Sequence, residues 1–211
     1  MKTIQTILQS WKHHLQRSRF RNQAVFSIAL LLTTLTLFTR FLGWVEARTG
    51  MVLADPVLAL IVPKDFTWLT FGLIYLAVLT TIIHLADKPA AFLLAIHSYT
   101  MMVIVRMMMM FLTPLEAPEG LIVLRDPLVQ FLGDGTAPTK DLFFSGHTST
   151  LVLLALVAQT ARLKALFATF AVIVAGCLVW QHVHYVVDVA VAPFVAYTCY
   201  RLALLWQART L

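Results

Sequence analysis

Six long apolar runs, separated by short polar stretches, organise the chain. A helix that crosses the hydrocarbon core of a bilayer needs roughly 20 mostly apolar residues. Each run therefore predicts a membrane-spanning helix. The predicted spans are Ala24–Trp44, Trp68–Leu85, Ala90–Leu112, His147–Ala161, Ala165–His182 and Tyr185–Leu205. The fourth run is short, and we expect its helix to begin at the membrane interface near Phe143. The expected fold is an all-α polytopic membrane protein with six transmembrane helices.

Two further segments do not fit the pattern of a spanning helix. Residues 1–23 are polar and rich in basic side chains, so we expect a cytoplasmic basic amphipathic segment that lies on anionic headgroups. Residues 24–211 then form the six-helix membrane domain. The apolar stretch "MVLADPVLALIV" (51–62) is too short to span a bilayer and contains Asp55-Pro56, which predicts an interfacial or re-entrant segment.

Composition agrees with a membrane protein. The 211 residues are 60% hydrophobic and 12% charged, whereas soluble domains are usually about 45–50% apolar and about 25% charged. The two cysteines, Cys177 and Cys199, both lie inside apolar runs, so we interpret them as packing residues and expect no disulfide.

The distribution of basic residues predicts the orientation. Six spans place both termini on one side, and ten basic residues but only one acid fall on that side. These basic residues are Lys2, Lys12, Arg17, Arg19, Arg21, Lys88, Arg162, Lys164, Arg201 and Arg209. Because basic residues favour the cytoplasmic side, we expect both termini in the cytoplasm. The net charge of +6 then reflects topology, and no nucleic-acid partner is expected.

Ionisable residues within the spans mark candidate functional positions, because a charge at membrane depth costs a few kcal/mol unless it is paired or functional. Asp188 follows His184 by four residues in "QHVHYVVD", a spacing that puts both side chains on one face of a helix. The carboxylate can then accept from the imidazole, fix its tautomer and raise its basicity. His182 points to a different face and is the weaker candidate.

A second histidine opens the fourth span in "DLFFSGHTST". Ser145 and Gly146 precede His147, and Thr148 follows it. The free N–H groups of a helix N-terminus suit a phosphate. One histidine held by Asp188 and a second at a helix start would allow phosphoryl transfer through a phosphohistidine, with His147 as acid and base.

Other interpretations of these residues remain open. In one alternative, Ser145 has no role beyond capping the helix, and His147 has no role beyond contact with water at the membrane interface. His184 and Asp188 could form a structural ion pair between helices. Four residues could instead ligate a metal ion, although no Cys cluster or HExxH spacing supports this. They are His147, His182, His184 and Asp188.

These motifs resemble the sphingomyelin synthase family within the type-2 phosphatidic acid phosphatase superfamily. "SGHT" followed by "HYVVD" is similar to that family's third and fourth motifs, and Asp141 stands where the family has an acid before its Ser-Gly-His-Thr. Upstream, Arg106 with "MMMMFLTPLEAP" resembles its Arg and Thr-Leu-Pro-x-Pro segment, and "VPKDFTW" resembles its Pro-Leu-Pro-Asp motif. The resemblance covers about residues 60 to 205.

The resemblance implies a His-His-Asp triad in which His184 is the nucleophile, Asp188 orients it and His147 serves as acid and base. It also implies a phospholipid donor, a lipid or water acceptor, and neither cofactor nor metal. The phosphatase branch carries an Arg shortly before its second His, whereas residues 176–183 here read "GCLVWQHV". Fewer cations around the phosphate favour a diester over a phosphomonoester.

Arg106 and the segment that follows it complete the predicted site. Arg106 lies about two turns before Pro114, roughly 10 Å below the outer end of its span. It is the best candidate for contact with phosphate, although it could instead snorkel outward or neutralise Asp188. The substrate-binding residues we expect are Ser145, Gly146, Thr148, Arg106 and Asp141. The segment 113–145 is expected to cover the pocket, and Glu116 could reach the site.

The function expected from the sequence is transfer of a phospholipid headgroup at an outward-facing site. The alternatives are a lipid phosphatase or phospholipase C that uses water, and a non-catalytic membrane protein with a structural His/Asp network. The compact chain with short termini favours a bacterial inner membrane protein whose site faces the periplasm.

Overall fold

The computed structural model describes residues 4–127 and 137–210. Within these ranges the regular structure is helical, and the β-type pairing is a single isolated bridge between Met51 and Leu115. The helices are α1 (Ile4–Leu15), α2 (Ser18–Ala47), the one-turn 3₁₀ helix η1 (Leu58–Leu60), α3 (Thr67–Leu85), α4 (Pro89–Leu112), α6 (Gly146–Val157), α7 (Ala161–Trp180) and α8 (Val186–Thr210). The expected all-α fold is confirmed.

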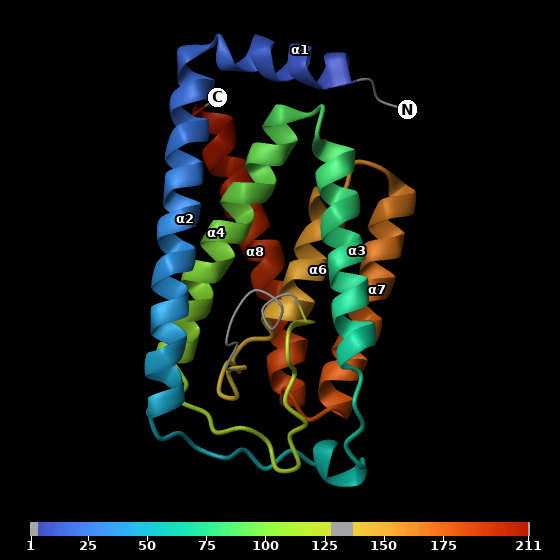
Figure 1. Cartoon of the computed structure of the whole chain (residues 1–211). Helices are drawn as coiled ribbons and strands as arrows, with labels where there is room; N and C mark the ends of the chain where they lie inside the picture. The colour runs from blue at the N-terminus through green and yellow to red at the C-terminus, as the bar shows by residue number, and fades with distance from the viewer. Residues whose placement is uncertain (1–3, 128–136, 211) are drawn as a thin grey trace.

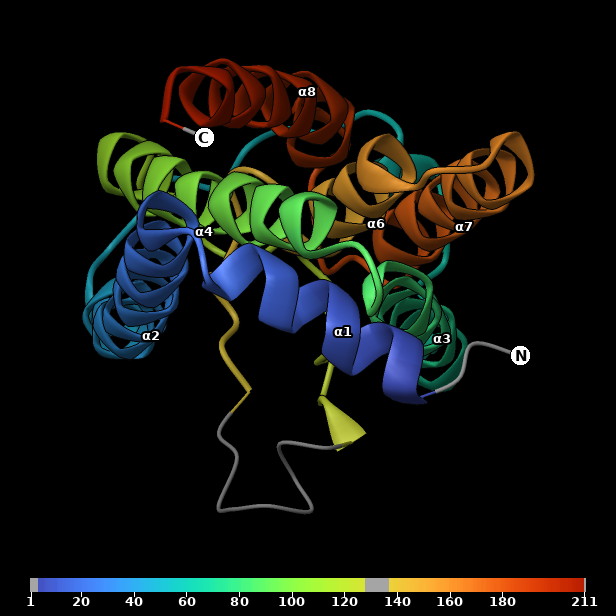
Figure 2. The same ribbon diagram turned by 90° about the horizontal axis from the view of Figure 1, so that it is seen from above.

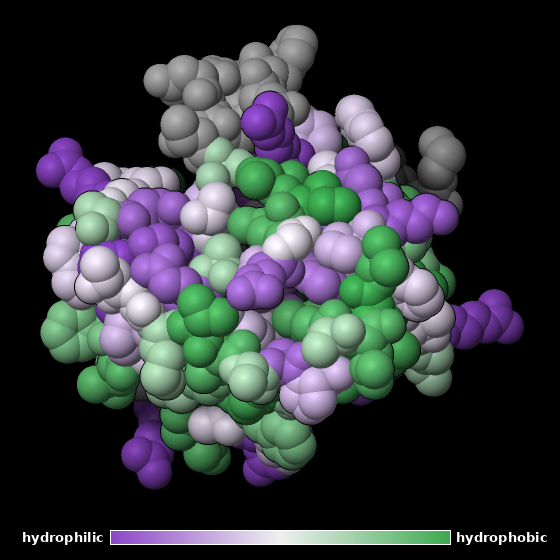
Figure 3. All heavy atoms as spheres, turned by 90° about the horizontal axis from the view of Figure 1, so that it is seen from below, coloured by the Kyte–Doolittle hydropathy of each residue, from purple (hydrophilic) through white to green (hydrophobic). Residues whose placement is uncertain are grey.

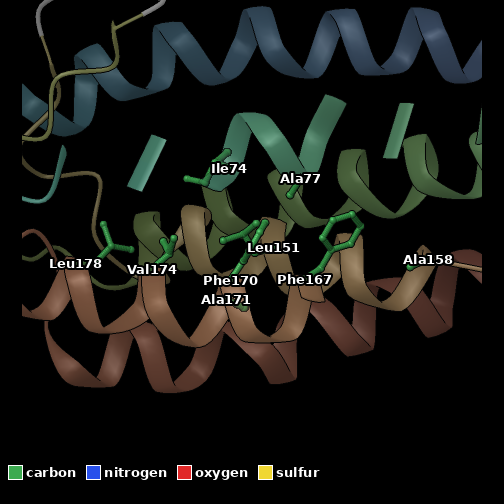
Figure 4. Packing of buried hydrophobic residues seen from close by; sticks show 9 residues of the cluster. All are labelled: Ile74, Ala77, Leu151, Ala158, Phe167, Phe170, Ala171, Val174 and Leu178. Atoms are coloured by element: carbon green, nitrogen blue, oxygen red, sulfur yellow. The ribbon is translucent and has the colours of Figure 1, made fainter. Parts of the chain in front are cut away.

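Six helices run roughly along one direction, and α1 lies across one end of the bundle (Figure 1). Both chain ends are at the end where α1 lies, and the long connections lie at the opposite end. Helix α6 occupies the middle of the bundle, packed on α3, α4, α7 and α8, whereas α2 packs mainly on α4 at the edge (Figure 2). Apolar side chains of α3, α6 and α7 meet in one buried cluster that includes Ile74, Leu151, Phe167 and Leu178 (Figure 4).

Among the described residues, five helices are long and apolar enough to cross a membrane, where the sequence predicted six. These five are α2, α3, α4, α7 and α8. The predicted span His147–Ala161 is instead the 12-residue helix α6, about 18 Å long at 1.5 Å per residue. It begins at Gly146 rather than near Phe143, because Ser145 caps it. It ends at Val157, and Thr160 caps the next helix by accepting from the backbone N–H of Leu163.

Several other boundaries differ from the predicted ones, and among them α7 begins at Ala161 instead of Ala165 and α8 ends at Thr210 instead of Leu205. Helix α2 begins at Ser18, so residues 1–23 contain α1 and the first turns of α2 rather than one separate segment. Helix α7 ends at Trp180 instead of His182. The stretch 51–62 contains only the single turn η1 and lies at the end of the bundle with the long connections.

Helix α1 is anchored to the turn between α3 and α4. The indole N–H of Trp11 donates to the carbonyl of Ala86 (2.7 Å), and the hydroxyl of Ser10 donates to the carbonyl of Asp87 (2.9 Å). The Trp11 ring meets the Phe92 ring edge-on at 5.8 Å. These contacts hold α1 across the gap between the ends of α2 and α3 (Figure 2).

The opposite end of the molecule carries interspersed hydrophilic and hydrophobic side chains (Figure 3). Exposed apolar side chains there include Leu60, Val62 and Trp68. Such a mixture is typical of a surface at the level of lipid headgroups, where one side of the surface contacts water and the other contacts acyl chains.

Candidate active site

The first turn of α8 brings His184 and Asp188 together. Asp188 is the third residue of α8, and its Oδ2 accepts from the backbone N–H of Tyr185 (3.0 Å), an arrangement that caps the helix. The same Oδ2 lies 3.3 Å from Nδ1 of His184. Because a carboxylate only accepts hydrogen bonds, Nδ1 of His184 carries the proton and Nε2 keeps its lone pair. Both side chains are fully buried.

His147 lies at the start of α6 and faces His184. The two imidazole rings are 6.4 Å apart between centroids, so one reacting group between them would be about 3 Å from both. Ser145 caps α6, since its Oγ accepts from the backbone N–H of Thr148. The backbone N–H of Ser145 donates in turn to the carbonyl of Asp188 (3.0 Å), which fixes the starts of α6 and α8 relative to each other.

Arg106 of α4 provides a cation beside the two histidines. Its Nε donates to the carbonyl of Phe144 (3.0 Å), and its Nη2 lies 2.9 Å from Oδ1 of Asp141. This ion pair lacks the alignment of a hydrogen bond, since neither atom has a hydrogen-bond partner within the described part of the chain. The guanidinium rests on Gly146, where a Cβ atom would overlap it. Glycine therefore allows Arg106 to reach the start of α6.

The lengths of the helices place His147 and Arg106 inside the bundle, at some depth from its end. Helix α6 is about 12 Å shorter than the neighbouring α7 at 1.5 Å per residue, and it stops short of the lower end of α7 (Figure 1). Arg106 lies six residues before Leu112, the end of α4, which is about 9 Å. His147 and Arg106 therefore meet at a similar depth inside the bundle.

The site opens into a cavity of about 850 Å³ between α2, α3, α4 and α6. Arg106, Asp141, Gly146, His147 and His184 line one end of this cavity. The remaining walls are mostly aliphatic and aromatic side chains. A large apolar cavity with convergent polar groups at one end is typical of a binding site for an amphiphilic ligand.

Comparison with known protein families identifies the segment that carries both histidines. Residues 140–205 match the family model for the PAP2 superfamily C-terminal domain. This segment is similar to the PAP2 superfamily C-terminal domain over 66 of the 211 residues of the chain. No curated protein and no solved structure matches the chain. The superfamily comprises lipid phosphatases and phosphotransferases.

The segment that matches the PAP2 family model contains most of the predicted site residues. His147, His184, Asp188 and Asp141 lie within it, whereas Arg106 lies upstream on α4. Arg106 pairs with Asp141 and not with Asp188, which excludes the predicted alternative of direct neutralisation of Asp188. The two histidines and Asp188 therefore lie inside the matched segment, and Arg106 comes from a helix outside it.

The structure places the remaining predicted residues around this group. Ser145 and Thr148 are buried, their side chains bond to each other (3.1 Å), and neither lines the cavity. Gly146 lines the cavity directly. His182 also lies away from the cavity: its backbone has a φ of 56°, and its Nδ1 lies 2.7 Å from the carbonyl of Glu119.

A polar pair in the cavity wall was not predicted from the sequence. The hydroxyl of Tyr75 donates to Oδ1 of Asp126, and both residues line the cavity near His147. Ala137 and Pro138 line the same region, so the described parts of the segment 113–145 contribute to the cavity. Residues 128–136 of that segment lie outside the described residues.

A second set of contacts that the sequence did not predict holds together the connecting segments at the mouth, which is the end of the bundle nearest the site. Glu116 accepts from the backbone N–H of Gly50 (2.7 Å) and from Nζ of Lys140 (3.0 Å). These two hydrogen bonds, that of Lys140 first, hold the pKa of Glu116 below its usual range. Gly50 lies so close to Leu115 that a Cβ would overlap the backbone there. Glu116 therefore joins the connection after α2 to the two ends of the segment 113–145, and it does not line the cavity.

Among the residues that the structure describes, no group of three His, Cys, Asp or Glu side chains is arranged to hold a metal ion. The four candidate ligands named from the sequence are divided between two places. His147, His184 and Asp188 face the cavity or support it, and His182 faces Glu119. The arrangement places two histidines, one of them paired with a carboxylate, and one guanidinium around one position.

Proposed function

We propose that this protein is a membrane phosphotransferase that moves the phospho-headgroup of a phospholipid to a lipid alcohol, in the manner of sphingomyelin synthases. The observation that supports it most is the pairing of His184 with Asp188 in a buried position, opposite His147 and beside Arg106. The PAP2 superfamily domain supports the broader assignment to phosphatases and phosphotransferases that act on lipid phosphates.

The proposed reaction has two displacement steps. In the first, the lone pair on Nε2 of His184 attacks phosphorus, the bond from phosphorus to the lipid oxygen breaks, and His147 donates a proton to that oxygen. Asp188 retains the Nδ1 proton of His184 and stabilises the charge that forms on the ring. In the second, an acceptor hydroxyl gives its proton to His147 and attacks phosphorus, and the bond from phosphorus to His184 breaks.

The charge of the cavity favours a phosphodiester as donor. Arg106 is the one cationic Arg or Lys side chain among the described residues that line the cavity, and Asp141 already offsets part of its charge. A phosphomonoester carries close to two negative charges near neutral pH, and such a group is normally bound by several Arg or Lys side chains. One partly neutralised cation matches the single charge of a diester better.

The experiment that tests the proposal is an assay of the purified protein in EDTA with isotopically labelled phospholipids. It is run with and without ceramide or diacylglycerol, and products are identified by mass spectrometry. We expect a new phospholipid only when the acceptor is present, and no product from the His184→Ala variant. Release of headgroup phosphate regardless of acceptor would instead identify a hydrolase of the same superfamily. Unchanged turnover by His184→Ala, or turnover that requires a divalent metal, would exclude the mechanism.

The proposal includes an orientation, with α1 in the cytoplasm and the site facing outward, as for a bacterial inner membrane protein with a periplasmic site. The end of the bundle with α1 carries most basic residues, including Lys12, Arg17 and Lys88. The orientation can be tested in a variant from which Cys177 and Cys199 have been removed. A single cysteine is then introduced in place of either Arg17 or Glu119. A membrane-impermeant maleimide added to intact cells should label only the cysteine at position 119.

A further inference from the structure

The cavity extends far beyond the groups that would perform the chemistry. Each of four helices contributes one stripe of lining residues, from the site toward the end of the bundle with α1. The stripes extend over Leu31 to Leu42 on α2, Phe71 to Leu85 on α3, Phe92 to Arg106 on α4, and His147 to Val157 on α6. The cavity is therefore a channel that runs parallel to the helices.

The length of the channel exceeds the depth of one leaflet. At 1.5 Å per residue, the stripe on α6 is roughly 15 Å long, that on α2 roughly 17 Å, and those on α3 and α4, which set the length of the channel, roughly 21 Å. One leaflet contributes about 15 Å of the hydrocarbon core. Because the site itself lies below the outer end of the bundle, a chain that enters the channel from the site reaches well into the opposite leaflet.

Beyond the site, the channel is lined mostly by apolar side chains, and the threonines there form hydrogen bonds within their own helices. The charged side chains that line the described cavity are Arg106, Asp126 and Asp141, and they lie with the histidines at the site end. The two lining threonines farther along, Thr81 and Thr150, donate their hydroxyl hydrogens to carbonyls of their own helices. A hydrocarbon chain therefore meets no unsatisfied hydroxyl hydrogen at these two threonines.

The far end of the channel is closed from outside by α1. Leu85 and Phe92 are the lining residues at that end, and the ring of Trp11 packs against Phe92. The hydrogen bond from Trp11 to the carbonyl of Ala86 fixes this contact immediately after the last residue of α3. Helix α1 crosses the end of the bundle at this place (Figures 1 and 2).

We infer that this channel binds one hydrocarbon chain of the lipid substrate, and that α1, through Trp11 and Phe92, sets the maximum length of that chain. The inference deepens the proposed function, on which it rests for the identity of the headgroup end. The occupant is an amphiphile with an anionic phosphate at Arg106 and a single extended chain. Ala95, a small lining residue eleven positions before Arg106 on α4, is a position that determines chain length.

The affinity should depend on chain length because of packing within the channel, and not because of transfer of the chain out of water. A chain that leaves the bilayer for the channel exchanges one apolar environment for another, so added methylenes bring little gain by themselves. A chain that is too short leaves a void, and a chain that is too long overpacks the closed end. The channel should therefore produce an optimum length rather than a steady increase.

The first test measures binding to the His184→Ala variant, so that turnover is not required. The probes are n-alkylphosphocholines with chains from about 10 to about 22 carbons, a range that brackets the estimated channel length. We expect affinity to pass through a maximum and to fall about tenfold for chains that exceed the channel. Equal affinity for all chains above the shortest would overturn the inference.

The second test moves the optimum. Ala95→Phe fills the channel partway along and should shift the maximum to shorter chains. Ala168→Phe is the matched control, because Ala168 is exposed on α7 and does not line the cavity. Phe92→Ala and Trp11→Ala should each shift the maximum to longer chains. A shift by Ala168→Phe equal to that by Ala95→Phe, or an unchanged maximum in Ala95→Phe, would contradict the assignment.

The two proposals can fail separately. If the binding maximum and its shifts are found but no phosphoryl transfer is detected, the channel is correct and the proposed reaction is wrong. If transfer is detected with the same kcat/KM for every chain length in the parent protein and in Ala95→Phe, the reaction is correct and the channel does not select chain length. A folded variant is confirmed in each case by its elution as a single species in detergent.

Discussion

The cavity has two unlike walls, which differ in how far each helix is buried. On one side, six of the 12 residues of α6 are buried, and α6 is surrounded by α3, α4, α7 and α8. On the other side, six of the 30 residues of α2 are buried, and none of these lies between Leu35 and Trp44, where α2 lines the cavity near the site. The groups that would perform chemistry are on the first wall.

The difference in burial between α6 and α2 corresponds to two different requirements that the cavity must meet. Reacting groups must be held within a fraction of an ångström, which a fully packed helix such as α6 can provide. A lipid must enter from the membrane, which a helix that packs mainly on one neighbour can permit. In this fold, α6 and the start of α8 meet the first requirement and α2 meets the second.

The largest expected effect concerns the packed wall. Asp188→Asn should lower kcat about 10²–10⁴-fold with little change in KM, because an amide carries no charge to stabilise the His184 imidazolium and can present N–H to the wrong ring nitrogen. Steady-state kinetics on the donor lipid would measure this. The control is His182→Asn, since asparagine tolerates a positive φ and His182 lies away from the cavity. Loss of activity in His182→Asn as great as in Asp188→Asn would contradict the assignment of the triad.

The next prediction compares the stability contributed by the two walls. Leu151 on α6 is fully buried, whereas Leu37 on α2 is 54% exposed. Leu151→Ala should cost about 2–3 kcal/mol through the void that it leaves, and Leu37→Ala should change stability by less than about 0.5 kcal/mol. Thermal unfolding in detergent would measure both, and an equal decrease in Tm would remove the distinction between the walls.

A smaller effect is expected at the contact between Gly146 and Arg106. Gly146→Ala introduces a Cβ that displaces the guanidinium, so we expect about a tenfold loss of kcat/KM, as for one misplaced electrostatic contact. Gly176→Ala is the matched control, because nothing lies within 4 Å of the Cβ that it would add. Wild-type kinetics in Gly146→Ala would show that the position of Arg106 is not critical.

The smallest effect concerns the mouth, which belongs to neither wall. The pKa of Glu116 is lowered in the folded protein, first by its hydrogen bond with Lys140. Its stabilising contribution is therefore present at pH values above the pKa of an unperturbed carboxyl and is lost as the pH falls through the lowered value. Glu116→Gln should lower Tm slightly at neutral pH, and the difference from the parent protein should shrink in acid. A difference that is independent of pH would exclude this origin.

The sequence predicted those parts of the fold and site that depend on local spacing. Runs of apolar residues were long enough to indicate the five long helices. The separation of His184 and Asp188 by four residues indicated that an imidazole and a carboxylate come together, although His184 lies just before α8 and not on a helix face shared with Asp188. The cap at Ser145 was visible for the same reason, because an N-cap acts on residues three positions away.

The remaining features depend on contacts between distant segments. The apolar run after His147 continues past Val157, so composition did not show that α6 ends there; the cap at Thr160 was the signal that could have shown it. The pairing of Arg106 with Asp141 joins residues on different elements, and so does that of Tyr75 with Asp126. Neither pairing, nor the channel itself, follows from the sequence until the relative rotation of the helices is known.

The shortness of α6 also determines the medium in which the reaction would take place. Arg106 lies about 9 Å from the end of α4 and is buried, so an attraction between Arg106 and a phosphate is stronger there than at the surface. Water activity is low at that depth, whereas a membrane lipid that carries a hydroxyl group is concentrated there. A phosphohistidine formed at such a depth would be partitioned toward an alcohol of the membrane and away from hydrolysis by the position of the site alone.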